Sequence, residues 1–164
     1  MILYLVRHGI AVDRTDPKCP PDPERPLTAR GVHKARSAAL GLRELGAKPD
    51  AILTSPYVRA AQTAEIFAEA LGFPVERIRV SDCLKPGDNP AETMREIARL
   101  RAKEAACFGH APHLDLMIAY LVGARTAFTE MKKAGAACLE QASAQGRWDL
   151  RWMVPPKILR ELSE

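Results

Sequence analysis

The sequence predicts an α/β domain of three layers, in which helices cover both faces of a central, mostly parallel β-sheet. Short apolar runs alternate along the chain with longer segments of helical period, and this alternation is typical of strands that are joined by helices. The first run, 2–6, is apolar without a break, as in strands that are buried on both faces. The 164 residues are 47% hydrophobic and 27% charged, which suits a soluble domain with its own core.

Apolar runs and local end signals define the expected elements. Helices are expected to begin near Thr28, Ser55 and Asn89, whose side chains can accept hydrogen bonds from free helix N–H groups, and near Pro112, because proline suits the first helical position. Pro56 and Pro90 directly follow Ser55 and Asn89 and are expected to take the first position of their helices. Strands are expected over 2–6, 51–54, 78–80, 105–108, 136–139 and 148–153.

We expect residues 1–164 to form a single domain without repeats or linkers. Prolines crowd the segment 10–27 and predict a long surface loop, because proline cannot join regular hydrogen-bond ladders. A polar turn is expected between the last two strands. The pair Pro155-Pro156 is expected to lead into a C-terminal tail over 155–164.

Composition argues against several classes of function. The 24 basic and 20 acidic residues give a formal charge of +4, but they are interspersed and aromatics make up only 5%, so we expect no nucleic-acid binding. The longest apolar stretch, around 116–124, is shorter than the ~20 residues that span a bilayer, so no membrane partner is expected. Four cysteines without Cys-x-x-Cys spacing, and no sign of a signal peptide, predict reduced thiols in the cytoplasm.

Common phosphate-binding and metal-binding motifs are missing. Neither the Walker loop nor the dinucleotide glycine pattern occurs. Cys19 and Arg25 match the Cys-x5-Arg spacing of thiolate phosphatases, yet prolines occupy three of the intervening positions and have no N–H to offer a phosphate. His110 and His113 form a compact pair without an acidic cluster beside them, so we expect neither a metal nor a cofactor.

Three short motifs at the ends of predicted strands indicate phosphoryl chemistry. Arg7-His8-Gly9 follows the first strand, Arg59 lies early in the helix after the second, and Gly109-His110 follows the strand 105–108. Ligands of parallel sheets bind beyond such strand ends. Arg7 and Arg59 can each give bidentate contacts to phosphoryl oxygens, and a neutral imidazole at His8 is a suitable nucleophile.

Together, and in this order, these motifs resemble the histidine phosphatase superfamily, also called phosphoglycerate-mutase-like. The length and the stretch Arg25-Pro-Leu-Thr-Ala-Arg-Gly31 are similar to its small bacterial SixA-like branch of phosphohistidine phosphatases. The resemblance implies a phosphoglycerate-mutase-like fold, transient phosphorylation of His8, and a second histidine, His110, that contacts the phosphoryl oxygens.

Three residues outside the three motifs, Asp88, Arg25 and Thr28, are further candidate site residues. Relatives carry a glutamate general acid after the third strand, where this chain has only Asp82 and Asp88 in an unfamiliar context; Asp88 is our candidate acid. Arg25 and Thr28 are candidate substrate-binding residues, although Thr28 is also explained as a helix cap. The lack of a recognisable general-acid motif suits a phosphohistidine substrate, because its imidazole leaves more easily than an alkoxide and depends less on a proton donor.

These observations favour a metal-independent phosphatase that dephosphorylates phosphohistidine on a signalling protein and acts as a monomer. A small-molecule phosphomonoesterase that uses the same His8 pocket is the alternative. A module that binds phosphate without turnover is the third possibility. Fold resemblance alone does not choose among these functions.

Overall fold

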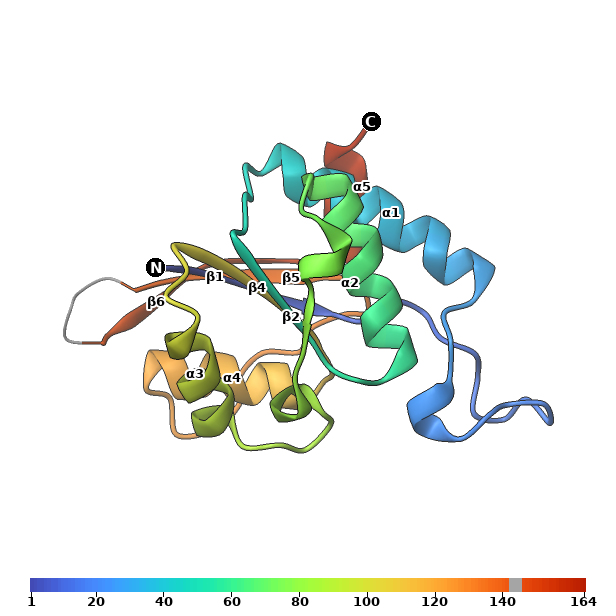
Figure 1. Ribbon diagram of the computed structural model, residues 1–164, viewed down its shortest axis with the longest axis horizontal. Coiled ribbons are helices and arrows are strands. Elements are labelled where there is room, and N and C mark those ends of the chain that lie inside the picture. The colour runs from blue at the N-terminus through green and yellow to red at the C-terminus, as the bar shows by residue number, and fades with distance from the viewer. Residues whose placement is uncertain (142–145) are drawn as a thin grey trace.

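The protein is described by a computed structural model over residues 1–141 and 146–164, in which six strands form a sheet between two layers of helices (Figure 1). The strand order is β3-β2-β4-β1-β5-β6. The first four strands in that order are parallel, whereas β5 runs antiparallel to both β1 and β6. The predicted three-layer fold with a mostly parallel sheet is confirmed. The strands are β1 (Ile2–Arg7), β2 (Ala51–Thr54), β3 (Arg79–Val80), β4 (Glu104–Gly109), β5 (Ala136–Gln141) and β6 (Trp148–Val154).

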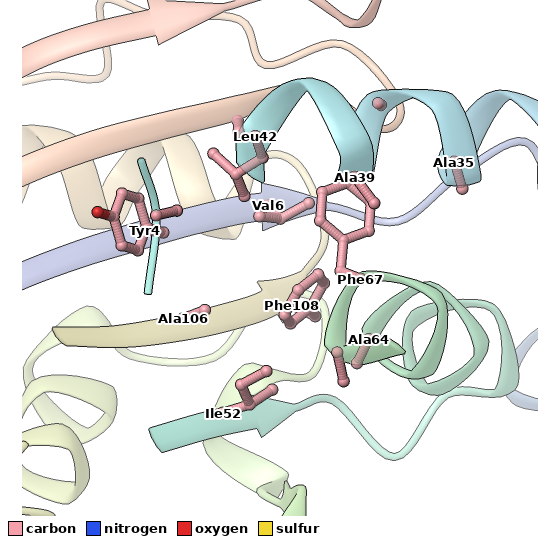
Figure 2. Close-up of a cluster of buried hydrophobic side chains, with 14 of the residues drawn as sticks. Tyr4, Val6, Ala35, Ala39, Leu42, Ile52, Ala64, Phe67, Ala106 and Phe108 are labelled. Atoms are coloured by element: carbon pink, nitrogen blue, oxygen red, sulfur yellow. The ribbon is translucent and has the colours of Figure 1, made fainter. Parts of the chain in front are cut away.

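The helices divide between the two faces of the sheet. One face is covered by α1 (Ala29–Glu44), α2 (Val58–Leu71) and α5 (Pro156–Leu162), and the other by α3 (Pro90–Arg99) and α4 (His113–Val122) (Figure 1). Figure 2 shows Val6 and Phe108 of the sheet packed beneath α1 and α2. The rings of Phe67 and Phe108 meet edge to face with centroids 5.3 Å apart, a favoured aromatic geometry. Alternate side chains of the central strands are therefore buried on both faces, as their apolar runs predict.

Helix starts agree with the predicted caps at two positions and differ at a third. The Thr28 hydroxyl accepts a hydrogen bond from the Gly31 amide at 2.9 Å, and the Asn89 side chain accepts one from the Ala91 amide at 3.0 Å. The helix expected after Ser55 starts later, at Val58. Ser55 accepts a hydrogen bond from the Tyr57 amide at 3.3 Å in the turn before the helix, so it shapes the approach to α2 and does not cap it.

The expected C-terminal tail is wrong, because residues 156–162 form helix α5. Proline breaks a helix interior but is well suited to the first turn, where its missing N–H is no loss, and Pro156 takes that place. Leu159 is fully buried against α1. A Cβ atom at Gly41 would lie 1.8 Å from the Leu159 carbonyl oxygen, so the two helices approach more closely than any residue but glycine permits at this position.

The proline-rich segment 10–27 contains one short 3-10 helix, η1 (Asp22–Glu24), and an isolated bridge between Ala11 and Leu27. The polar turn expected between β5 and β6 includes residues 142–145, which lie outside the described residues. Among the described residues, no helix combines the length and apolar character needed to cross a bilayer.

Candidate active site

The ends of three neighbouring parallel strands bring the predicted residues together. His8 follows β1, Ser55 follows β2 and His110 follows β4, and β4 lies between β1 and β2. Arg59 reaches the same place from the first turn of α2. A cavity of about 520 Å³ opens there, and Arg7, His8, Arg59 and His110 all line it. Carboxyl ends of strands are where ligands of such sheets bind, so this cavity is our candidate active site.

His8 is held in one tautomer and one orientation. The residue is 6% exposed, and its Nδ1 lies 2.7 Å from the Gly9 carbonyl oxygen. Since a carbonyl only accepts, Nδ1 carries the ring proton and Nε2 keeps its lone pair. The Arg59 Nε–H donates to this Nε2 at 3.3 Å, which is consistent with the assignment. The backbone around Gly9 is fixed by its N–H, which donates to the Thr63 hydroxyl of α2 at 3.0 Å.

Arg59 is buried and bound to an acidic residue of the proline-rich segment. Its Nη1 donates to the Asp22 carbonyl oxygen at 2.7 Å, and its Nη2 lies 3.3 Å from the Asp22 carboxylate. The same carboxylate accepts hydrogen bonds from Arg14 at 2.9 Å and Arg25 at 2.9 Å. Burial opposes ionisation of Asp22, but these arginines outweigh it and lower the pKa of the carboxyl. The cavity therefore contains a persistent carboxylate beside its arginines.

His110 has one satisfied ring nitrogen and one free one. Its Nε2 lies 2.8 Å from the Ser55 hydroxyl. Its Nδ1 is buried and has no hydrogen-bond partner among the described residues. The rings of His8 and His110 face each other across 5.1 Å between centroids. An unsatisfied buried nitrogen is costly unless a ligand or water completes it, so Nδ1 is an available contact for a ligand in the cavity.

Arg7 and Arg25 also belong to the basic lining of the cavity, together with Arg14 and Lys133. Arg7 Nη1 donates to the Met131 carbonyl oxygen at 2.6 Å, while its buried Nε has no partner among the described residues. Arg25 is 9% exposed, and its Nη1 donates to the Val12 carbonyl oxygen at 2.7 Å. Arg25 thus lies at the site, as we expected of a substrate-binding residue, and it also ties together the proline-rich segment.

The structure does not bring Asp88 or Thr28 into the cavity. Asp88 is absent from the lining residues, and its carbonyl oxygen accepts a hydrogen bond from His113 Nδ1 at 2.9 Å. This geometry gives no support to Asp88 as a general acid. Thr28 is likewise absent from the lining, because its hydroxyl is engaged with the Gly31 amide and the Ile10 carbonyl.

Both histidines of the cavity are neutral at physiological pH. Burial lowers the pKa of His8 to about 3, and the positive charges of Arg59, Arg7 and Lys133 contribute, against the effect of the bond to Gly9. Burial also lowers the pKa of His110 to about 3, with further contributions from His8 and Arg59. Perturbed pKa values of this kind cluster at functional sites.

Two site residues, Asp22 and Ser55, are not found by sequence reasoning. Asp22 pairs with Arg59 across 37 positions and Ser55 pairs with His110 across 55, and no local pattern reports contacts of such separation. A weak signal exists for Ser55, since it directly follows a predicted strand. Within the described part of the chain, no three His, Cys, Asp or Glu side chains are grouped as metal ligands.

Comparisons with known proteins agree with this geometry. A sequence model described as "Histidine phosphatase superfamily (branch 1)" matches residues 3–85. An uncharacterized protein from Picosynechococcus sp. is 36% identical over 149 residues, which are 88% of each chain. The structure of the protein histidine phosphatase SixA complexed with tungstate is similar with a TM-score of 0.86 and 23% identity, over 97% of this chain and 99% of that one.

A second solved structure shares the fold at lower identity. Mycobacterial glucosyl-3-phosphoglycerate phosphatase is similar with a TM-score of 0.74 and 19% identity, and the match covers 94% of this chain and 98% of that chain. At such identities, these two structural likenesses establish a common fold, while the named activities belong to those proteins.

Proposed function

The chain belongs to the histidine phosphatase superfamily (branch 1), and from this premise we propose that it is a phosphohistidine phosphatase with His8 as nucleophile. The observation that carries the proposal is the unprotonated Nε2 of His8, held beside the guanidinium of Arg59 at 3.3 Å. A fixed, neutral imidazole next to buried cationic donors is suited to attack an anionic phosphoryl group.

In the first step, His8 Nε2 attacks phosphorus and forms a P–N bond, while the bond from phosphorus to the substrate imidazole breaks. The leaving imidazole keeps the electron pair of that bond and departs as a neutral ring when its other nitrogen carries a proton, so this step needs no acid from the enzyme. Arg59 must release Nε2 as the phosphoryl group arrives, and its guanidinium then binds the phosphoryl oxygens together with Arg7. Such donors stabilise the charge that the equatorial oxygens carry in the transition state.

In the second step, water attacks phosphorus of phosphorylated His8, and the P–N bond to Nε2 breaks. The electron pair returns to Nε2, the attacking water passes one proton to a phosphoryl oxygen, and inorganic phosphate leaves with that proton. His110 contributes through its free Nδ1, which can donate to a phosphoryl oxygen when the Ser55 hydroxyl donates to Nε2. In that arrangement Nε2 of His110 accepts from the Ser55 hydroxyl and Nδ1 carries the ring proton.

The acidic residues of the cavity favour phosphohistidine over phosphate esters. Asp13 and Asp22 are the carboxylates of the lining. Hydrogen bonds from Thr15 lower the pKa of Asp13, and the arginines lower that of Asp22, so both are poor proton donors at neutral pH. An alkoxide needs a donor more than an imidazole does.

The test compares phosphate release from a phosphohistidine peptide and from para-nitrophenyl phosphate, with and without chelator. We expect chelator-resistant turnover of the peptide and a loss of at least about a thousandfold in His8→Ala, since removal of a nucleophile has effects of this size. His33→Ala, on the exposed face of α1, is the control. Faster turnover of the ester would favour a phosphomonoesterase, and binding of phosphate without turnover would favour a binding module. Activity that survives in His8→Ala would exclude this nucleophile.

A further inference from the structure

A second cavity adjoins the candidate active site. It measures about 400 Å³, and it shares Arg7, Ile10 and Lys133 with the first cavity. We name it the basic groove. Its outer wall is built by Lys34 of α1 and Arg160 of α5, two helices that lie side by side in Figure 1. The basic groove therefore adjoins the cavity in which the phosphoryl group is expected.

The groove is lined by cations without acidic residues among them. Besides Arg7, its lining includes Lys34, Lys132, Lys133 and Arg160. Within the described residues only Lys132 of these four forms an ion pair, with Glu130. The pKa of Lys34 is lowered by the charge of Arg30, then by burial and by the charge of Arg160. Of these neighbours, Arg160 lines the groove and lies close enough to Lys34 for the two charges to repel each other, so an anion placed between them would relieve this repulsion.

The uncharged lining indicates which anion fits. It consists of Ile10, Ala134 and Pro156, which are aliphatic and offer no aromatic face. Single-stranded nucleic acids gain much of their affinity by stacking bases on aromatic side chains. A polypeptide gains instead from ion pairs with its carboxylates and from contact of its aliphatic stems with such a surface. The groove is therefore better suited to an acidic peptide than to a nucleic acid.

We propose that the basic groove binds an acidic segment of the phosphorylated protein substrate while the phosphohistidine of that protein occupies the adjoining cavity. The inference rests on the proposed function, which supplies a protein as substrate. It assigns Lys34 and Arg160 as specificity residues that act on binding and take no part in phosphoryl transfer.

A binding experiment tests the groove separately from catalysis. Fluorescence anisotropy would measure binding of a labelled, unphosphorylated Glu-rich decapeptide to the wild type and to K34Q/R160Q. The variant R36Q/K157Q is the matched control, since it removes the same charges from exposed positions of the same two helices. We expect about fivefold weaker binding in K34Q/R160Q, from the loss of two exposed ion pairs, and little change in the control.

A kinetic experiment tests whether the basic groove affects KM for a phosphorylated peptide substrate. Phosphohistidine peptides with Glu or Ala flanks would be compared, with para-nitrophenyl phosphate as the small substrate. We expect K34Q/R160Q to raise KM for the Glu peptide about fivefold and to leave turnover of the small substrate unchanged. Equal binding and equal KM in all three proteins would overturn the groove proposal. Tighter binding of an oligonucleotide of equal charge, lost in the same variant, would also overturn it.

The two proposals fail in different ways. If the wild type turned over no phosphohistidine peptide, the proposed function would fail, while the anisotropy comparison would still decide whether the groove binds acidic peptides. If turnover were rapid but insensitive to flanking charge, the proposed function would stand and the groove proposal would fall.

Discussion

At the scale of single residues, Asp22 dominates the electrostatics of the cavity. Its carboxylate receives ion pairs from Arg14, Arg25 and Arg59. The carboxylate forms an ion pair with the guanidinium of Arg59 and offsets part of the positive charge that the three arginines carry. A phosphate that enters the cavity must compete with this carboxylate for Arg59. Asp22 thus limits how tightly the product can bind.

We predict that Asp22→Asn binds inorganic phosphate more tightly. The amide keeps the shape of the side chain but not its charge, so Arg59 is freer to contact phosphate oxygens. The inhibition constant of phosphate should fall about fivefold, which corresponds to about 1 kcal/mol for a partly exposed ion pair. Steady-state inhibition with para-nitrophenyl phosphate or a phosphohistidine peptide measures it.

Asp16→Asn is the control for this prediction, because Asp16 is exposed in the same segment and lies outside the cavity lining. Weaker inhibition by phosphate in Asp22→Asn would contradict the prediction. It would mean that Asp22 matters chiefly because it positions Arg59.

Residue types and local position reveal both histidines and most arginines of this site but miss Asp22 and Ser55. Arg7, His8 and His110 are predictable because each lies at the end of a strand that the sequence marks clearly, and Arg59 because it lies early in the helix that follows the second strand. No sequence signal identifies Asp22 as a site residue, because its arginine partners approach it only when the proline-rich segment folds. Asp88 stays a prediction that the geometry does not support: the sequence places it near the site but cannot show that its carbonyl oxygen contacts His113.

At the scale of elements, Thr28 acts on helix α1. Its hydroxyl accepts from the Gly31 amide at 2.9 Å and donates to the Ile10 carbonyl. We predict that Thr28→Ala lowers the free energy of unfolding by about 1 kcal/mol, the usual effect of losing an N-cap. Urea denaturation measures this change, and KM for the phosphorylated substrate should stay close to that of the wild type.

Thr126→Ala, at an exposed position after α4, controls for loss of a threonine. A large rise in KM in Thr28→Ala without loss of stability would instead support a substrate-binding role for Thr28.

Element types were predictable from the sequence to a greater extent than element ends. The strand at 2–6 extends to Arg7, and the strand at 105–108 extends to Glu104 and Gly109, because pairing with neighbouring strands recruits polar residues at strand ends. Helix α5 was missed because two prolines looked like a terminator, whereas burial of Leu159 against α1 stabilises the helix. Tertiary packing, which local sequence patterns do not report, therefore determines that this segment is helical.

At the scale of the whole molecule, the buried histidines couple stability to pH. His8 and His110 have a pKa of about 3 in the folded chain, against an ordinary value of 6.5. Between these values the unfolded chain binds protons that the folded chain does not, so stability falls as the pH falls. We predict that each histidine contributes up to about 2 kcal/mol of the loss between pH 7 and pH 5.

Urea denaturation at pH 7, 6 and 5 checks this prediction. His110→Gln should flatten the dependence of unfolding free energy on pH, while replacement of the exposed His33 by Gln should leave it unchanged. An identical slope in the wild type and in His110→Gln would show that His110 is protonated as readily in the folded chain as in the unfolded one.

The position of β4 between β1 and β2 has a consequence for biosynthesis. The ribosome releases β1 and β2 early, but they are neighbours only through β4, which pairs with both. Parallel pairings over such sequence distances form slowly. A nascent chain that has not yet reached residue 104 therefore carries Arg7, His8 and Arg59 without the strand that unites them. The cavity that these side chains line can form only once β4 has been synthesised and has paired with β1 and β2.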